Sequence, residues 1–501
     1  MSTSSGTPGT LTVGGNLVLT PGATLAMQFG KADTVGGALN DLIQVSGNLT
    51  LDGTLDVVVP TGGTFGPGVY RVINYGGVLT NNGLSLGTMP ADSTSTIQTS
   101  IAGQVNLVNT AGLALNFWDG AAGPKFNDAI DGGDGVWQNG AGNNNWTDSA
   151  GRTNAAYADG TFAIFAGTGG TVTIDNSLGA VSASGLQFAA DGYTIQGDAL
   201  TLTGPQSTIR VGDGTSGGAG FTTTIAADLT GATQLVKTDA GTLILSGANG
   251  YTGGTSIEGG TLQIAADANL GDAAGGVGLA GGALHTTATF ASDRAFAITG
   301  DSTIRTDQGT ALTLNAALSG TGALTKDGAG TLRLTGDSGA FAAAGHVAGG
   351  TLVVDGILGS TIDVASAGRL EGNGRVGGIA NKGVVAPGGT SIGTLTVAGD
   401  YAGNGGRLEI EATLGGDNSP ADRLVVNGAT SGSTQISVIN RGSLGAQTIE
   451  GVKIVDIAGA SNGTFTLDSD YLFQGQPTVE LGQHVGRYAP QPCLRRGKPD
   501  I

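Results

Sequence analysis

The sequence predicts an all-β protein built as a parallel β-helix, and three observations carry this prediction. Glycine supplies 95 of the 501 residues, against a usual share of ~7%, and each glycine costs about 1 kcal/mol inside a helix. Short runs of strand-forming residues alternate with Gly, Asn or Asp, which tolerate the positive φ of tight corners. Strand starts recur roughly every eight to ten residues, a spacing that a sandwich, a barrel or a solenoid could each produce.

Two internal duplications favour the solenoid. Residues 237–247 match 326–336 at an offset of 89 residues, and the match resumes at 258–264 and 348–354. A second duplication joins the two ends of the chain, where residues 9–16 match 393–400, 41–47 match 422–428 and 69–73 match 452–456. Repeated strand–turn units fit rungs that stack at about 4.8 Å and bury a few Leu, Val or Ile on each neighbour.

Taken in order, the elements fall into five segments. Residues 1–110 are an N-terminal β-helical segment, and 111–165 form a connector that holds all three tryptophans, Trp118, Trp137 and Trp146. Residues 166–392 continue the β-helix with the first pair of repeats, and 393–482 are its C-terminal rungs. Residues 483–501 carry the single cysteine, three prolines and a basic run, and we expect this unrelated tail to be disordered.

Composition excludes several classes of protein. The formal charge of −18 repels phosphate backbones, so no nucleic acid is expected as a partner. Cys493 is the only cysteine, which rules out an internal disulfide and a thiolate metal cluster. No apolar run reaches about 18 residues, the length that a membrane-spanning helix needs, so no such helix is expected. The N-terminal residues 1–6 have neither a basic nor an apolar region, so no secretory signal is expected there.

At this point the residues resemble a known family, the passengers of autotransporters, which are the type V secretion proteins of Gram-negative bacteria. Residues 237–264 are similar to a passenger-associated transport repeat, and 368–397 are similar to the last rungs of such passengers. The segment that begins Phe117-Trp118-Asp119-Gly120 also resembles a segment of large members. The resemblance covers about residues 9–482.

The resemblance implies a right-handed β-helix at the outer membrane, on the cell surface or secreted, whose C-terminal rungs act as an autochaperone that folds first. It further implies an adhesin-like or structural role without catalysis. Partners would be host or bacterial surface glycans or proteins. Residues 470–476 resemble the passage before the family's translocator barrel, and the basic tail then follows. We therefore expect this chain to lack both the signal peptide and the barrel. A frameshift or a gene fragment would explain this departure from the family.

Several motifs that could carry chemistry are better interpreted as structure. Residues 336–339 (Gly-Asp-Ser-Gly) resemble the nucleophile segment of trypsin-like proteases, but Ser338 would need a histidine base, and only His346 lies near in sequence. The internal repeat aligns this motif with residues 247–250, which predicts a turn. Residues 372–377 fit Gly-x-Gly-x-x-Gly, but the dinucleotide site needs a following helix, and more β-turn sequence follows instead.

Acidic and aromatic residues give the remaining candidates. Glu409 and Glu411 share one strand face about 6.6 Å apart, within the range for paired glycosidase carboxylates, but with Arg407 they fit a solvated outer face. Residues 131–135 (Asp-Gly-Gly-Asp-Gly) fit a turn better than a calcium loop, because no nonapeptide repeat is sustained. The three histidines, His285, His346 and His484, lie in no zinc-ligand spacing.

The tryptophans of the connector could form a sugar-stacking platform, but buried aromatics that close a non-repeating module fit better. We therefore assign no catalytic, cofactor or metal residue and expect no cofactor. The leading hypothesis is a surface passenger of adhesin or structural type. The alternatives are a β-helical polysaccharide lyase or glycoside hydrolase, and a non-secreted fragment without a role.

Overall fold

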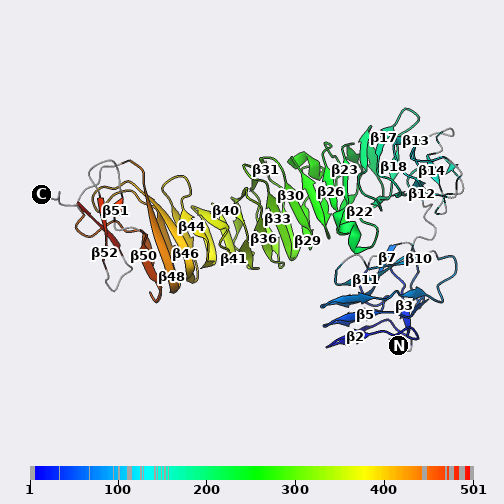
Figure 1. The fold of residues 1–501 in the computed structure, drawn as a ribbon, viewed down its shortest axis with the longest axis horizontal. Helices are drawn as coiled ribbons and strands as arrows, with labels where there is room; N and C mark the ends of the chain where they lie inside the picture. Colours follow the sequence, from blue (N-terminus) through cyan, green and yellow to red (C-terminus); the bar gives the residue numbers. More distant parts are fainter. Residues whose placement is uncertain are drawn as a thin grey trace. The chain divides into compact units, whose positions relative to one another are not determined.

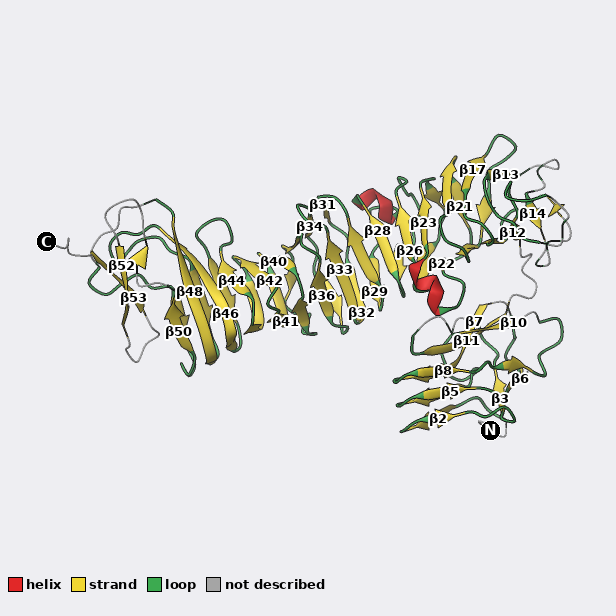
Figure 2. Cartoon of the chain, viewed as in Figure 1, coloured by secondary structure: helices red, strands yellow, loops and turns green. Residues whose placement is uncertain are grey.

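The structure is a computed structural model that divides into two compact units, Met1–Tyr251 and Thr252–Ile501. It describes residues 6–32, 34–66, 68–93, 95–99, 102–109, 116–124, 127, 129–139, 143, 145–147, 149, 151, 154–155, 157–442, 448–468, 471–472, 479–484 and 491–496. The helices of these residues are the short 3-10 helices η1 (Ser216–Gly220) and η2 (Asp267–Leu270), and neither could cross a membrane (Figure 2). The all-β prediction is confirmed.

The first unit opens with three rungs of a three-sided parallel stack. One sheet holds β1 (Thr10–Val13), β4 (Leu42–Val45) and β7 (Gly68–Tyr75); the second holds β2 (Leu17–Val18), β5 (Leu49–Leu51) and β8 (Leu79–Asn81); the third holds β3 (Thr24–Gln28), β6 (Thr54–Val58) and β9 (Ser85–Leu86). Each strand pairs in parallel with its counterpart in the next rung. The stack ends with β11 (Gln104–Asn109), antiparallel to β7, and β10 (Ser95–Gln98), antiparallel to β11.

A second parallel stack fills the rest of this unit. Its first sheet is β12 (Asn116–Trp118), β16 (Phe162–Phe165), β19 (Gly185–Phe188), β22 (Gln206–Val211) and β25 (Gln234–Thr238). Its second is β13 (Gly135–Gln138), β17 (Thr171–Asp175), β20 (Thr194–Gly197), β23 (Thr222–Ile225) and β26 (Thr242–Leu245), and its third is β18 (Ser182–Ala183), β21 (Leu200–Leu202) and β24 (Leu229–Thr230). The short strands β14 (Trp146–Thr147) and β15 (Asn154–Ala155) add to β12 in antiparallel fashion.

This arrangement corrects the expected role of residues 111–165. We expected a connector that separates two solenoid segments, but β12 and β13 pair in parallel with β16 and β17. The described part of the segment is therefore the first rung of the second stack. Its composition differs because an end rung must cover the apolar interior as well as add to it.

The second unit is a longer parallel stack, drawn from green to orange in Figure 1. One sheet is β27 (Thr255–Ile257), β29 (Val277–Ala280), β32 (Phe296–Gly300) and β35 (Leu318–Gly320). In this unit the larger sheet comprises β28 (Thr261–Ile264), β30 (Ala283–Thr286), β31 (Phe290–Ser292), β33 (Ser302–Thr306), β34 (Ala311–Leu314), β36 (Leu324–Asp327), β37 (Thr331–Leu334), β38 (Asp337–Ser338), β39 (Gly345–Val347) and β40 (Gly350–Val354). It goes on with β41 (Ile357–Val364), β42 (Gly368–Gly372), β43 (Arg375–Asn381), β44 (Val384–Pro387), β45 (Thr394–Val397), β46 (Tyr401–Ala412), β47 (Arg423–Val426), β48 (Thr430–Asn440), β49 (Val455–Ile457) and β50 (Thr464–Leu467).

The core of this stack is a continuous column of aliphatic side chains. Strand registry aligns one buried residue per rung, in the order Leu312, Leu332, Leu352, Leu370, Val385, Leu408 and Ile436. Burying each such side chain contributes about 1.5–3 kcal/mol. Stability therefore accumulates from one rung to the next, without one globular centre.

The structure of the C-terminal residues contradicts the expectation of a disordered tail. The tail 483–501 was expected to be disordered, yet β53 (Gln491–Arg496) pairs antiparallel with β52 (Val479–His484), which pairs with β51 (Tyr471–Leu472). This pairing satisfies backbone groups that a lone strand would leave to water. The other tail residues lie outside the described part of the chain.

Candidate functional site

The three tryptophans form one buried aromatic cluster at the first rung of the second stack. Trp118, Trp137 and Trp146 are 0–1% exposed. Trp146 lies 5.2 Å from Trp118 and 4.9 Å from Trp137, ring centre to ring centre, in edge-on geometry. Tyr157 and Phe165 complete the cluster. Rings without an exposed face cannot stack on a sugar, so the predicted burial of these aromatic residues is confirmed and the sugar platform is not supported.

The protease-like motif does not assemble a triad. Ser338 is 2% exposed, and its Oγ accepts a hydrogen bond of 2.8 Å from the Leu318 amide. His346 points to the outer surface instead and pairs with Asp363, Nδ1 to Oδ2 at 2.9 Å. The predicted turn is in fact the two-residue strand β38 followed by a turn. A buried hydroxyl that holds a backbone amide orders the rungs and offers no nucleophile.

The dinucleotide-like motif consists of solenoid corners, as predicted. Residues 372–377 run from the end of β42 into β43, with no helix between them. Gly372 has φ of +124°, and a Cβ placed there would lie 2.0 Å from the Val354 carbonyl oxygen of the preceding rung. Only glycine meets both conditions.

The paired glutamates of β46 are both engaged in ion pairs. Glu409 pairs with Arg369 of β42, which also pairs with Glu371 on its own strand. Glu411 pairs with Arg441. The expectation of a solvated outer face is wrong for Glu411, which is only 5% exposed. Residues 412 and 421 form an antiparallel bridge, and the loop that this bridge closes follows β46 directly.

The remaining candidates are also structural. Asp131 accepts a hydrogen bond from the side chain of Asn127, and Asp134 accepts one from the Thr171 amide of the next rung, so both carboxylates make structural contacts. His285 pairs with Asp307, Nε2 to Oδ1 at 2.8 Å, and nothing is described of the His484 side chain. Across the described residues, no cluster of three or more His, Cys, Asp or Glu could hold a metal ion.

A polar hollow of about 350 Å³ lies among residues 417–423 and 450–453. Burial of Asp417 acts to raise its pKa, but the amides of Gly451, Ile449 and Glu450 outweigh it and hold the pKa of Asp417 below its ordinary value. A general acid requires a raised pKa. Asp417 is therefore fitted to fix the loop and not to donate a proton.

Sequence reasoning missed two buried lysines at matching positions of the duplicated segments. Lys237 donates hydrogen bonds to the carbonyls of Thr238 and Asp239, and Lys326 donates to those of Asp327, Gly328 and Gly349. Burial lowers the pKa of Lys237 to about 7 and that of Lys326 to about 8. The sequence carried a signal for these lysines, because both matched segments begin with lysine. This match served only to align the two segments.

The lysine pKa values predict a pH dependence of stability. Between pH 7 and 10 the unfolded chain holds the Lys237 proton while the folded chain releases it. The free energy of unfolding should therefore rise with pH, by up to about 1.4 kcal/mol per pH unit for one proton. Lys237→Met should remove this part of the slope. Urea unfolding midpoints from pH 7.5 to 9.5 measure it, with Lys382→Met, at an exposed lysine, as the control. Equal slopes in all three proteins would contradict the prediction.

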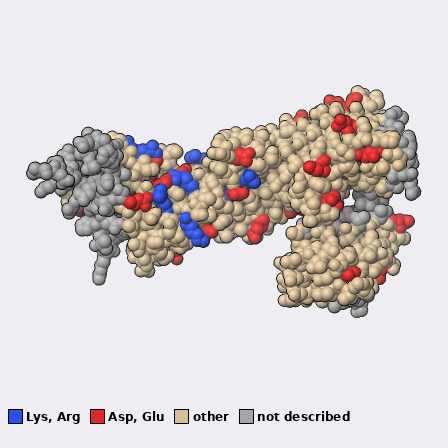
Figure 3. All heavy atoms as spheres, in the orientation of Figure 1, with Lys and Arg blue, Asp and Glu red and all other residues tan. Residues whose placement is uncertain are grey.

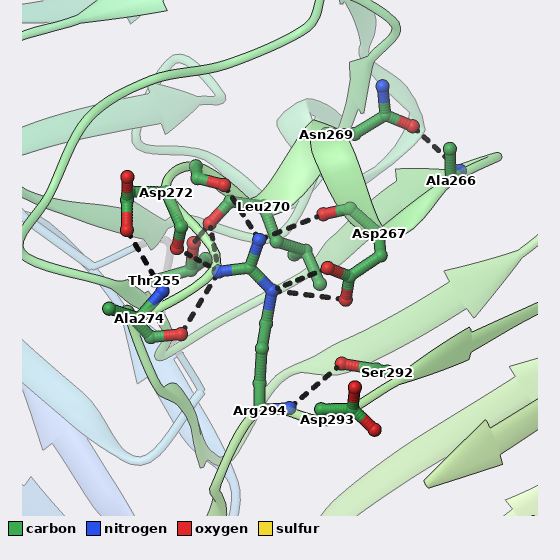
Figure 4. A network of polar contacts seen from close by, with 12 residues as sticks. Thr255, Ala266, Asp267, Asn269, Leu270, Asp272, Ala274, Ser292, Asp293 and Arg294 are labelled. Atoms are coloured by element: carbon green, nitrogen blue, oxygen red, sulfur yellow. Dashed lines mark hydrogen bonds and ion pairs between the residues drawn. The ribbon is translucent and has the colours of Figure 1, made fainter.

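Arg294 is a third missed residue, and it organises the loop between β28 and β29 (Figure 4). Its Nε donates to both carboxylate oxygens of Asp267, at 3.0 and 3.1 Å. Its two other nitrogens donate to five backbone carbonyls, those of Asp267, Leu270, Gly271, Asp272 and Gly275. Thr255 donates to the Leu270 carbonyl as well. One guanidinium thus satisfies carbonyls that the short helix η2 leaves unpaired.

Charge is distributed unevenly over the surface. Seven of the 21 lysines and arginines lie between 369 and 453, namely Arg369, Arg375, Lys382, Arg407, Arg423, Arg441 and Lys453. Figure 3 shows basic side chains gathered on one stretch of the second unit, next to acidic ones. Much of the aspartate elsewhere binds a backbone amide of another rung, as Asp191 does for Thr222 and Asp228 does for Ala248. The acidic composition therefore serves the corners of the solenoid.

These features define a class: a parallel β-helical protein without disulfides, built from duplicated segments. Family models agree. Residues 379–476 match an autochaperone domain of type 1, and residues 235–264 and 324–354 match the passenger-associated transport repeat. The chain thus carries the transport repeats and the autochaperone domain of autotransporter passengers. The autochaperone match starts at residue 379, earlier than the expected 393.

Two of the similar relatives are named adhesins, and another is named a serine protease. The chain is 50% identical to the adhesin BmaC autotransporter of Brucella suis biovar 1 over 469 residues, which are 92% of this chain and 14% of that protein. It is 34% identical to the autotransporter adhesin AIDA-I of Escherichia coli over 21% of this chain and 9% of that one. It is also 38% identical to an extracellular serine protease of Serratia marcescens, over 24% of this chain and 12% of that one. The chain spans only a small part of each relative.

Proposed function

We propose that the chain is part of an autotransporter passenger displayed at the bacterial cell surface, where it serves adhesion and carries out no catalysis. The identity of 50% to an adhesin over 92% of the chain carries this proposal. The structure supports it, since stacked rungs give a long outer surface made of repeated, short, polar side chains. Thr171, Thr194 and Thr224 stand in register on three successive rungs, for example.

The described surface offers little to the alternative of a lyase or hydrolase. The glutamates of β46 are neutralised by Arg369 and Arg441, and the pKa of Asp417 is lowered where a general acid needs it raised. Likeness to a serine protease does not supply a nucleophile either, because Ser338 is buried against a backbone amide. We therefore keep the adhesive function as the proposal.

The partners that fit this surface are glycans or proteins on host or bacterial cells. Columns of threonine hydroxyls can donate and accept hydrogen bonds, as sugar hydroxyls and extended peptides require. The stretch between 369 and 453 adds alternating charges, such as Arg369 beside Glu371 and Arg407 beside Asp468. A partner held by such pairs should be released by salt.

Attachment of coated beads to cells tests the proposal. Fluorescent beads carrying the full chain should bind epithelial or bacterial cells saturably and several-fold above beads carrying albumin or the urea-unfolded chain. Treating the cells with glycosidases or with trypsin separates glycan from protein partners. Binding no greater than that of albumin beads would contradict adhesion. Cleavage of a polysaccharide or of casein by the same preparation would contradict the absence of catalysis.

A further inference from the structure

The N-terminal rungs repeat, atom for atom, a carboxylate clamp of the autochaperone domain. Asp422 accepts the Gly393 amide on Oδ1 at 2.8 Å and the Glu411 amide on Oδ2 at 2.7 Å. Asp41 accepts the Gly9 amide on Oδ1 and the Gln28 amide on Oδ2, each at 2.7 Å. Each aspartate thus ties the start of the first strand of a rung to the end of its last strand, and both are at most 1% exposed.

The backbone around the two clamps is paired in the same way. Asp41 and Asp422 each donate their own amide to the carbonyl of the residue whose amide they accept, Gln28 or Glu411. Strand β1 pairs with β4 in the register that β45 adopts with β47, since Thr10 faces Leu42 as Thr394 faces Arg423.

The corners between the rungs agree as well. Asn16 accepts the Asn48 amide at 2.8 Å, as Asp400 accepts the Ala429 amide at 2.7 Å. A Cβ on Gly47 would lie 2.8 Å from the backbone carbonyl oxygen of Gly15, and one on Gly428 would lie 2.5 Å from that of Gly399. These glycines are therefore required at both corners.

The N-terminal segment also ends as a closed body. Its three rungs bury a core that includes Leu25, Leu49, Leu55 and Tyr70. Strand β11 then lies antiparallel on β7 and is itself covered by β10. Among the described residues β10 is the last strand of this sheet, so the parallel stack ends at the antiparallel hairpin. Three stacked repeats are about the minimum for a stable solenoid.

We propose that residues 9–109 are a second module of the autochaperone type, a folding nucleus that forms early and independently of residues 379–476. Its clamp, corners and closing hairpin supply contacts that do not depend on the rungs that follow. The passenger would then fold from two nuclei, with the stack of residues 116–378 formed after both. This proposal concerns folding and does not depend on the adhesive function.

Pulse-labelling hydrogen exchange during refolding of the full chain tests it. Amides of 9–109 and of 379–468 should both gain protection in the first phase, ahead of 166–360. Asp41→Ala should make the native amides of 9–109 exchange about tenfold to a hundredfold faster, because hydrogen bonds to a charged group are lost. It should leave 379–468 unchanged. Asp422→Ala should speed the exchange of amides in 379–468 and leave those of 9–109 unchanged.

A matched control lies outside both modules. Asp228→Ala removes one corner carboxylate from the second stack of the first unit and should alter neither module. If Asp41→Ala yields no folded chain, Asp41→Asn keeps the shape and loses one of the two amide bonds, so the same local loss of protection is expected. Protection of 9–109 that appears only with or after 166–360 would overturn the proposal. So would an Asp41 variant that slows every segment equally.

Discussion

Replacing Arg294 by methionine is expected to lower the free energy of unfolding of the second unit by roughly 3–5 kcal/mol, the usual cost of breaking a buried ion pair from one side. The guanidinium is 3% exposed and holds the Asp267 carboxylate at 3.0 Å. Methionine fills much of the same volume but removes the Arg294 donor from that carboxylate and from five backbone carbonyls. Of these carbonyls, Leu270 keeps the Thr255 hydroxyl and Asp272 keeps the Gly275 amide. Urea unfolding followed by circular dichroism measures the loss.

Two further variants show whether the donor geometry is responsible. Arg294→Lys keeps the charge but lacks the planar fork, so it should recover only part of the lost stability. Arg305→Met makes the same chemical change at an exposed position of β33 and should cost less than about 0.5 kcal/mol. Native-state hydrogen exchange should place the damage in residues 266–276. If Arg294→Met lowered the free energy of unfolding no more than Arg305→Met, the hydrogen-bond network of Arg294 would not contribute to stability.

The sequence was sufficient for the fold because a solenoid repeats local rules. Glycine at 372 and 377 predicts corners without knowledge of the rest of the chain, and the matching segments at 237 and 326 predict stacking of like on like. The burial of Trp118 and Trp146 was also predictable, because these large residues lie in a segment that is not repeated elsewhere in the chain. These inferences needed only composition, spacing and internal similarity.

Features that depend on contacts between rungs escaped the sequence. The partners of Arg294 lie 19 to 27 residues earlier in the chain, and nothing local distinguishes this arginine from an exposed one. Glu411 was assigned to the surface by strand alternation, but alternation fails where a loop returns over the end of β46. The two hydrogen bonds of Asp422 could not be predicted either, because Gly393 and Glu411 lie next to Asp422 only in the folded chain.

Replacing Trp146 by alanine is expected to cost roughly 3–5 kcal/mol, as large-to-small changes of buried aromatic residues do. The indole packs within 5.6 Å, ring centre to ring centre, of Trp118, Trp137, Tyr157 and Phe165. Its removal would open a cavity at the end rung that covers the apolar interior of the second stack. Urea unfolding monitored by the remaining tryptophan fluorescence measures the cost, and hydrogen exchange should show residues 157–211 opening first.

A matched pair of variants separates packing from hydrogen bonding at this end. The Trp146 Nε1 has no hydrogen-bond partner among the described residues, so Trp146→Phe loses ring volume but no hydrogen bond and should cost clearly less than Trp146→Ala. Val136→Ala trims a 40% exposed side chain on the same rung and should have little effect. Because each rung shields its neighbour, loss at an end rung should spread inward. A Trp146→Ala protein that keeps the protection of residues 157–211 would show that the aromatic cluster does not close the stack.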